Sequence, residues 1–140
     1  MKSKFYSRLS KIVGPVVRFL FRIKYHGIEN EPDEKDGAYV LICNHISNAD
    51  PVFLCAAGTK QQPHFMAKKE LFKVPVVGAF IRAIGSYPVD RKSSDITALR
   101  NTINLLKNND CVGIFPQGTR VPGIDPATAT VKNGVGLIAA

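Results

Sequence analysis

The sequence predicts an α/β fold, with a mostly parallel or mixed sheet flanked by helices and an N-terminal amphipathic helix. Two continuous apolar runs, residues 38–43 and 111–115, indicate strands buried on both faces, as in parallel sheets. Between them, segments with helical spacing alternate with short strand-like runs, which is the element order of α/β proteins. The 140 residues, 45% hydrophobic and 21% charged, can bury the core of one globular domain.

The N-terminal segment, residues 1–28, holds most of the positive charge of the chain. It contains seven Lys or Arg residues and no Asp or Glu, while the whole chain has a formal net charge of +8. A nucleic-acid-binding protein would spread a basic face over its folded domain instead. We therefore expect no nucleic-acid partner.

An apolar stretch within this segment, residues 12–23, is interrupted by Arg18 and Arg22. It is too short and too charged to span a membrane, and no cleavage site follows it, which argues against a signal peptide. We expect an amphipathic helix that begins at Pro15 and lies in the membrane interface, with its cations against anionic lipid headgroups. The alternative is an amphipathic helix that packs on its own domain.

Helix and strand signals alternate through the domain that follows, residues 29–140. A polar linker is expected at residues 29–37. The strands that follow it are expected at residues 38–43, 63–67, 86–89 and 111–115. The helices between them are expected at residues 52–57, 75–84 and 96–106.

Proline, glycine and aspartate mark the ends of these elements. Asp50 has the side chain of a helix cap, Pro51 and Pro75 suit first helical positions, and Gly85 can end the second helix. Pro88 lacks an amide hydrogen, so its strand is expected at an edge of the sheet or at a strand end. The third helix is amphipathic, because its apolar residues are three or four apart: Ile96, Leu99, Ile103 and Leu106.

The cysteines and histidines are not spaced like disulfide frameworks or metal ligands. An odd number of cysteines, far apart, indicates reduced thiols in a cytosolic environment, and we interpret all three as buried apolar side chains: Cys43, Cys55 and Cys111. No metal site is expected, because ligand spacing is absent among the three histidines, His26, His45 and His64.

Three blocks carry polar residues that come just after predicted strands: 44–50, 85–91 and 115–120. Ligands of open α/β sheets bind in the crevice outside the carboxyl ends of the strands. We therefore expect residues from all three blocks to line one cleft, although tens of residues separate them in the sequence.

His45 and Asp50, in the first block, are candidates for a general base and its carboxylate partner. A histidine that removes a proton from a hydroxyl must be neutral and held in one tautomer, and a carboxylate on the far ring nitrogen holds it so. The spacing alone is weak evidence, because a helix cap and a turn histidine explain it equally well.

The other two blocks end in arginine. Arg91 and Arg120 suit phosphate oxygens, because a guanidinium group donates two parallel hydrogen bonds. Gly118 lets the backbone of its loop approach a ligand closely, and Thr119 adds a hydroxyl. Each arginine alone is explained as well by a solvated surface position, but the combination suggests a hydroxyl activated beside a phosphate.

These blocks, in this order, resemble the motifs of the glycerolipid acyltransferase family, most of all its bacterial lysophosphatidic acid acyltransferases. The motif NHxxxxD matches residues 44–50, and a glycine followed by a short strand ending in arginine matches residues 85–91. The motif FPEGTR matches residues 115–120 except at one position, and the segments around Lys68 and Lys132 are also similar to family segments. The resemblance runs from about residue 25 to the end.

The resemblance implies a glycerol-3-phosphate acyltransferase-like fold and a membrane-associated enzyme of phospholipid biosynthesis. Such an enzyme moves a fatty acyl group from acyl carrier protein or coenzyme A to the free hydroxyl of 1-acylglycerol-3-phosphate (lysophosphatidate), giving phosphatidic acid. The thioester is the acyl donor, and no further cofactor is implied. The basic N-terminal segment is expected to hold the protein on anionic lipid at the cytoplasmic face of the cell membrane.

The resemblance also assigns roles to residues of the three blocks. His45 is the base that removes the hydroxyl proton, Asp50 orients it, and no covalent acyl-enzyme is implied. Gln117 and Lys68 are candidate contacts to the acceptor. Four residues are implied to bind the phosphate of the acceptor: Arg91, Gly118, Thr119 and Arg120.

Two departures from the family pattern bear on function. Gln117 stands where the family usually has Glu, so a negative charge beside the acceptor is lost and acceptor identity is affected. The chain ends at Ala140, before the fourth family motif, so we expect a domain truncated at its C-terminus that lacks its last strands. The alternatives are acylation of glycerol-3-phosphate or another lysophospholipid, and a non-catalytic membrane-binding fragment.

Overall fold

A parallel four-stranded sheet forms the centre of the computed structural model, which describes residues 3–90, 95–125, 127–132 and 134–139. The strand order is β1-β4-β2-β3, and all three pairings are parallel. The strands are β1 (Val40–Ile42), β2 (Pro63–Lys68), β3 (Tyr87–Val89) and β4 (Cys111–Ile114). The predicted α/β class is confirmed.

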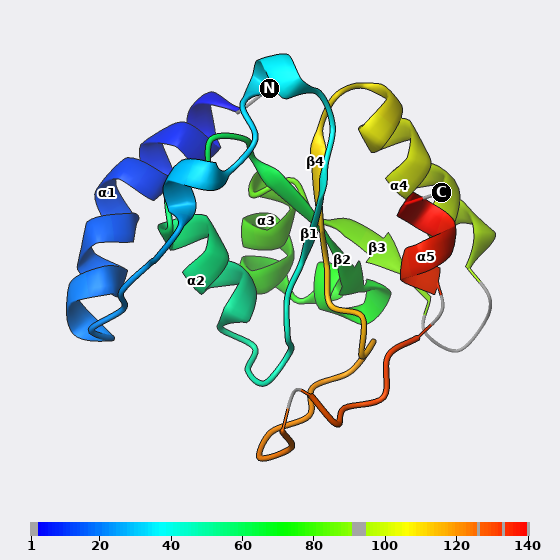
Figure 1. Cartoon of the computed structure of the whole chain (residues 1–140). Coiled ribbons are helices and arrows are strands. Elements are labelled where there is room, and N and C mark those ends of the chain that lie inside the picture. Colours follow the sequence, from blue (N-terminus) through cyan, green and yellow to red (C-terminus); the bar gives the residue numbers. More distant parts are fainter. Residues whose placement is uncertain (1–2, 91–94, 126, 133, 140) are drawn as a thin grey trace.

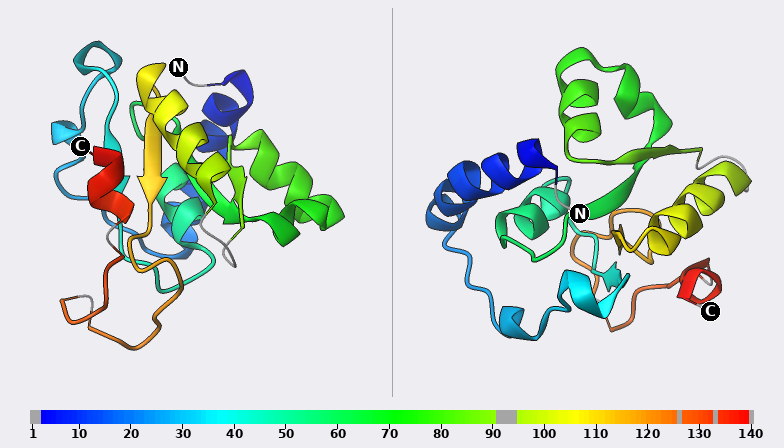
Figure 2. Two further views of the ribbon diagram at one scale, coloured as in Figure 1. Left: turned by 90° about the vertical axis from the view of Figure 1, so that its right-hand side faces the viewer. Right: turned by 90° about the horizontal axis from the view of Figure 1, so that it is seen from above.

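Helices cover both faces of the sheet. Figures 1 and 2 show α1, α2 and α3 on one side and α4 and α5 on the other. The helices are α1 (Lys4–Leu20), α2 (Asp50–Ala56), α3 (Pro75–Ala83), α4 (Ile96–Lys107) and α5 (Gly134–Ala139). The described part of the chain also contains short 3-10 turns, η1 (Ile28–Asn30) and η2 (Glu34–Asp36) between α1 and β1, and η3 (Lys69–Lys73) between β2 and α3.

The two apolar strand runs occupy different places in the sheet. All four residues of β4 are buried, because β4 lies between β1 and β2, as the sequence predicts for a strand covered on both faces. The same prediction is wrong for residues 38–43, since β1 pairs only with β4 among the described residues and Ile42 is 56% exposed. The strand that contains Pro88 lies at the opposite edge, as predicted.

Helix α1 begins earlier than the sequence suggested. Ser3 caps it by accepting a hydrogen bond from the Tyr6 amide at 3.1 Å, and Pro15 lies inside the helix, so the prediction that Pro15 begins it is wrong. A proline in a helix interior removes one backbone hydrogen bond. Packing on the domain compensates for this loss, because Tyr6 and Gly14 are buried.

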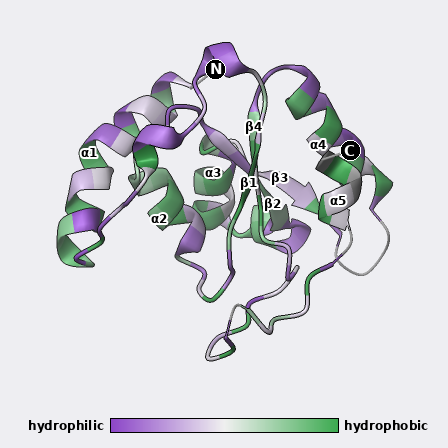
Figure 3. Cartoon of the chain, in the orientation of Figure 1, coloured by the Kyte–Doolittle hydropathy of each residue, from purple (hydrophilic) through white to green (hydrophobic). Residues whose placement is uncertain are grey.

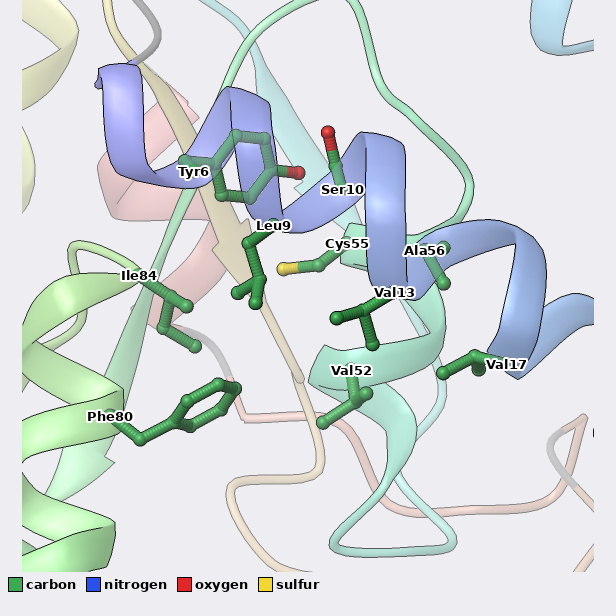
Figure 4. Close-up of a pocket in the computed structure, with 11 residues that line it drawn as sticks. Tyr6, Leu9, Ser10, Val13, Val17, Val52, Cys55, Ala56, Phe80 and Ile84 are labelled. Atoms are coloured by element: carbon green, nitrogen blue, oxygen red, sulfur yellow. The ribbon is translucent and has the colours of Figure 1, made fainter.

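An apolar cavity of about 40 Å³ lies where α1, α2 and α3 meet (Figure 4). Tyr6 and Val13 of α1, Cys55 of α2 and Phe80 of α3 are among the side chains around it. Gly14 brings α1 close to α2, since a Cβ at this position would lie 3.1 Å from the carbonyl oxygen of Ala56. One face of α1 therefore packs on its own domain.

The rest of α1 keeps large apolar side chains in solvent, and Figure 3 shows apolar colour reaching the C-terminal end of the helix. The exposed apolar residues of this helix are Phe5, Ile12, Val13, Val16, Phe19 and Leu20. No helix in the described part of the chain is both long and apolar enough to cross a membrane.

The polar segment 29–37 is exposed, as predicted, but it is also tied to the domain. The Glu31 carboxylate accepts hydrogen bonds from the Tyr39 hydroxyl and from the Lys60 amide, the latter at 2.8 Å. The buried Gln61 side chain donates to the Gly37 carbonyl at 3.0 Å. These contacts lie at the amino ends of the strands, away from the polar blocks.

Candidate active site

The first and third polar blocks meet at the carboxyl end of the sheet. The loop after β1 contains His45, and the loop after β4 contains residues 115–120; both leave the lower end of the strands in Figure 1. The Val121 amide donates a hydrogen bond to the His45 carbonyl at 2.8 Å, which joins the two loops directly. From the second block, Asp90 follows β3, whereas Arg91 lies outside the described residues.

His45 and Asp50 form a hydrogen-bonded pair. The ring nitrogen Nδ1 lies 2.9 Å from Asp50 Oδ2, and the His45 residue is only 8% exposed. The same carboxylate oxygen accepts hydrogen bonds from the Ile46 amide at 2.8 Å and the Ser47 amide at 2.9 Å. The predicted imidazole–carboxylate contact is therefore present.

The expected capping role of Asp50 is wrong. The residue at the N-cap of α2 is Ala49, and Asp50 is the first helical residue, followed by Pro51. Because the carboxylate turns back to the two amides of the preceding loop, it fixes the path of that loop and the position of His45 together.

Asp50 stays ionised in this environment. Burial disfavours its charge, but hydrogen bonds from the Ser47 amide, the His45 ring and the Ile46 amide outweigh burial and hold the pKa of the carboxyl below its ordinary value. An ionised carboxylate can only accept a hydrogen bond, so Nδ1 of His45 carries the hydrogen that it donates to Asp50. In the neutral imidazole the free lone pair is therefore on Nε2. Nε2 has no hydrogen-bond partner among the described residues, as a base that takes a proton from a ligand requires.

Aromatic stacking fixes the plane of the imidazole. The ring of Phe115 stacks on His45 with centroids 4.3 Å apart, and it also stacks with the ring of Phe65, with centroids 5.6 Å apart. Sequence reasoning treated Phe115 only as a strand and motif residue. Its contact joins residues that are remote in the chain, and no local pattern signals it.

Gln117 connects the two loops from within. Its side-chain oxygen Oε1 accepts a hydrogen bond from the His45 amide at 3.2 Å, and its Nε2 donates to Asn44 Oδ1 at 3.4 Å. The residue is buried. Both ends of the amide are thus engaged with the His45 loop, and contact of Gln117 with an acceptor stays a prediction.

A cleft of about 230 Å³ adjoins this pair of loops. Its wall includes the end of β4, Phe115, Gly118 and Asp90, and the side of Lys132. Lys132 was given no role from the sequence, although its segment resembles the family. The remaining lining residues are Met66, Val89, Gly113 and Ile114.

Other residues predicted for the site lie at its margin. Thr119 and Arg120 are exposed on the loop after β4 and are not among the residues that line the cleft. Lys68 is exposed at the end of β2, with its ammonium 3.8 Å from Glu70 Oε2. The roles of these three residues in acceptor binding stay predictions.

Burial limits thiol chemistry near this site. Burial, followed by the charge of Asp50, raises the pKa of the Cys43 thiol to about 11, so little nucleophilic thiolate forms at neutral pH. Among the described residues, no group of three or more His, Cys, Asp and Glu lies together as metal ligands would. The chemistry available to the described site is proton transfer by an imidazole paired with a carboxylate.

The chain is similar to known acyltransferases over most of its length. Residues 22–140 match a family model described as Acyltransferase. Over 98 residues the chain is 39% identical to the 1-acyl-sn-glycerol-3-phosphate acyltransferase of Bacillus subtilis (strain 168), covering 70% of this chain and 48% of that protein. Over 131 residues it is 37% identical to the protein of the same name from Streptococcus pneumoniae (strain ATCC BAA-255 / R6), covering 90% and 47%.

A solved structure shares the fold. The chain superimposes on the crystal structure of the 1-acyl-sn-glycerophosphate (LPA) acyltransferase PlsC from Thermotoga maritima with a TM-score of 0.62 and 28% sequence identity, covering 84% of this chain and 45% of that one. The chain spans about half the length of the curated relatives it matches.

Proposed function

The chain belongs to the acyltransferase family, and on this premise we propose that it acylates lysophosphatidate to phosphatidic acid. The acyl group comes from a thioester, and it goes to the free hydroxyl of 1-acylglycerol-3-phosphate. The observation that carries the proposal is the 2.9 Å contact between His45 Nδ1 and the ionised Asp50 at the carboxyl end of the parallel sheet.

The reaction needs one base that later becomes an acid. His45 Nε2 takes the proton of the acceptor hydroxyl while the hydroxyl oxygen attacks the thioester carbonyl carbon. The tetrahedral intermediate then collapses and its carbon–sulfur bond breaks. The protonated His45 gives its proton to the departing sulfur, which leaves as a thiol. Asp50 stabilises the imidazolium between these two steps.

The acceptor phosphate is proposed to bind at the loop after β4. Gly118 has φ 68°, a left-handed conformation that suits glycine and sets the turn of this loop. Thr119 and Arg120 on this loop, together with Arg91, are the proposed phosphate ligands. Acyl carrier protein and coenzyme A both remain candidate carriers of the acyl group.

The membrane surface is the proposed source of the acceptor. Helix α1 leaves apolar side chains such as Phe19 (82% exposed) and Ile12 (71% exposed) in contact with solvent. The basic residues of segment 1–28 lie on and around the same helix. Apolar side chains in the acyl region and cations at the headgroups are the two contacts that hold a helix in the interface, and we propose the cytoplasmic leaflet as its location.

Replacing His45 tests the catalytic proposal. We expect His45→Ala to lose nearly all acyl transfer from an acyl thioester to lysophosphatidate. Because the buried ring also packs on Phe115, thermal unfolding is measured in parallel and turnover is compared at a temperature where both proteins are folded. His26→Ala is the matched control, because His26 is exposed and lies outside the three blocks. Full turnover in His45→Ala would remove the proposed base, and equal losses in both variants would point to a non-catalytic cause.

A panel of acceptors tests the substrate. The purified chain is given one acyl thioester and either lysophosphatidate, glycerol-3-phosphate or lysophosphatidylcholine. We expect the highest kcat/KM with lysophosphatidate. A preference for glycerol-3-phosphate or for the choline lipid would replace the proposed acceptor while leaving the family chemistry intact.

A further inference from the structure

We infer that Lys132 binds the phosphate monoester of the substrate in the cleft at the end of β4, and so acts as a specificity residue. The inference rests on the proposed function, which supplies the phosphorylated acceptor. It adds a cation from a segment beyond the three motif blocks. Lys132 lines the cleft together with Phe115 and Gly118.

A backbone hydrogen bond fixes the position of Lys132 beside the loop after β4. Its amide donates a hydrogen bond to the Pro116 carbonyl at 2.9 Å, so the chain returns to the loop after β4 at this residue. The Gly118 amide donates to the Phe115 carbonyl at 2.9 Å, which closes the turn beneath the lysine. The origin of the side chain is therefore held against the loop that borders the cleft.

Gly118 gives the lysine side chain its path. A Cβ at position 118 would lie 2.9 Å from Lys132 Cε, closer than real Cβ contacts, and at a tight 3.0 Å from both Cδ and Nζ, so the lysine side chain lies directly against Gly118. The aliphatic stem of Lys132 therefore crosses the open face of Gly118 and carries the ammonium to the cleft. Gly118 therefore has two roles: it adopts a positive φ, and it leaves room for the Lys132 side chain.

The charges around the cleft favour an anion. Asp90, the carboxylate among the lining residues, forms a salt bridge with Lys69. Lys132 has no carboxylate within salt-bridge distance in the described ranges, and it is the basic residue among those that line the cleft. Lys132 is exposed, but it lies beside the apolar wall of the cleft, and its ammonium group is free to donate charged hydrogen bonds to a phosphate bound there.

The cleft is also adjacent to the proposed base. Phe115 forms part of the cleft wall, and the same ring stacks on His45 with centroids 4.3 Å apart. If Lys132 binds the phosphate, the glycerol part of the acceptor headgroup lies between this lysine and the imidazole of His45. Phosphate monoesters occur in lysophosphatidate and also in coenzyme A, and the experiment must separate these two sources.

Steady-state kinetics of Lys132→Ala separate them. We expect KM for lysophosphatidate to rise about 10-fold to 100-fold, the loss expected for one charged hydrogen bond, with KM for acyl-CoA unchanged. Activity with the unphosphorylated acceptor monoacylglycerol should not fall. Lys132→Arg should restore most of the affinity, and Lys107→Ala, an exposed lysine at the end of α4, is the matched control.

Three results would overturn the inference: an unchanged KM for lysophosphatidate, a rise confined to acyl-CoA, or an equal loss with monoacylglycerol. Calorimetric titration with sn-glycerol 3-phosphate keeps this test separate from the proposed function. If the wild-type chain transfers no acyl group but binds this ligand more tightly than Lys132→Ala does, the lysine site stands and the reaction falls. Equal titrations in both proteins, together with equal KM values, would reject the lysine site.

Discussion

The side-chain oxygen of Gln117 accepts a hydrogen bond from the backbone amide of His45 at 3.2 Å, across 72 positions of the sequence. The other end of the same amide donates to Asn44 at 3.4 Å. One buried side chain thus sets the distance between the loop that carries the proposed base and the loop after β4. The relation of these loops depends on a residue that is not itself expected to react.

Replacing Gln117 with Leu should uncouple the loops. The substitution keeps the volume but leaves the His45 amide without its partner, at a cost of about 1–3 kcal/mol in the free energy of unfolding. We expect acyl transfer to fall about 10-fold to 100-fold, because the base loses its position. Denaturant titration and turnover assays measure the two effects.

Gln117→Glu is the informative companion. Glutamate retains an oxygen for the His45 amide, and Asn44 can rotate its amide group to donate to the second oxygen. We therefore expect stability and turnover close to those of the wild type. A loss as large as that of Gln117→Leu would contradict this expectation and show that the site requires a neutral amide at position 117.

Asp50→Asn should remove the orientation of His45 without removing its ring. Acyl transfer is expected to fall by about 10⁴-fold, because an amide in place of the carboxylate favours the wrong tautomer. The carboxyl of Asp50 has a pKa below its ordinary value of 3.8, so its charge stabilises the folded protein above that pH. This contribution is lost as the pH falls through the lower, folded pKa.

Unfolding measured between pH 7 and pH 2 tests this pH dependence. The difference in free energy of unfolding between the wild type and Asp50→Asn should shrink as the pH falls below about 4. Glu34→Gln, at an exposed carboxylate of η2, should show no comparable change. A difference that grows on acidification would contradict the assignment.

Gly113→Ala should destabilise the centre of the sheet. Gly113 pairs with Phe65 in the neighbouring strand, and a Cβ at position 113 would lie 2.1 Å from a ring atom of Phe65. Moving this ring disturbs the stack that leads through Phe115 to His45, so we expect a loss of about 1–3 kcal/mol in stability together with reduced turnover.

Gly136→Ala is the matched control for that substitution, because a Cβ at position 136 meets nothing within 4 Å. Alanine has the better helix propensity, so this variant should be as stable as the wild type or slightly more so. Equal thermal denaturation of both variants would mean that the glycine in β4 is not required by the Phe65 ring.

The three thiols should react slowly in the folded protein. Burial is the main cause that raises the pKa of each to about 11, so only about 0.1% of each thiol is ionised at pH 8. We expect a thiol-specific disulfide reagent to label Cys43, Cys55 and Cys111 at least 100-fold more slowly in buffer than in urea. Rapid labelling of one residue in buffer would identify an accessible, activated thiol.

Local sequence signals predicted much of the fold. The helix α4 and the position of Pro88 at a sheet edge are both confirmed, because each depends on a residue and its near neighbours. The apolar stripe predicted for α4 is correct only in part, since Ile96 is 61% exposed while Ala98 and Thr102 are buried. The start of α1 was misplaced, since a proline is tolerated within a helix when buried contacts such as that of Tyr6 hold it. The exposed position of β1 depends on which strands lie beside it in the sheet, and local sequence spacing does not determine the order of strands.

The site was predictable only in part for the same reason. The contact between His45 and Asp50 spans five positions and follows from a single loop, so spacing could indicate it. The stacking of Phe115, the hydrogen bond of Gln117 to His45 and the path of Lys132 over Gly118 join distant segments. These contacts arise from strand order, which brings the loops after β1 and β4 together.

The convergence of the His45 ring and two loop amides on one oxygen of Asp50 has a kinetic consequence. The amide dipoles are oriented by the backbone, so the negative charge is in place before any proton arrives on the imidazole. In water, solvent molecules would have to turn toward a newly formed cation, and that reorganisation raises the activation barrier. Here the reorganisation is completed when the chain folds, and the loop needs no motion to receive the charge.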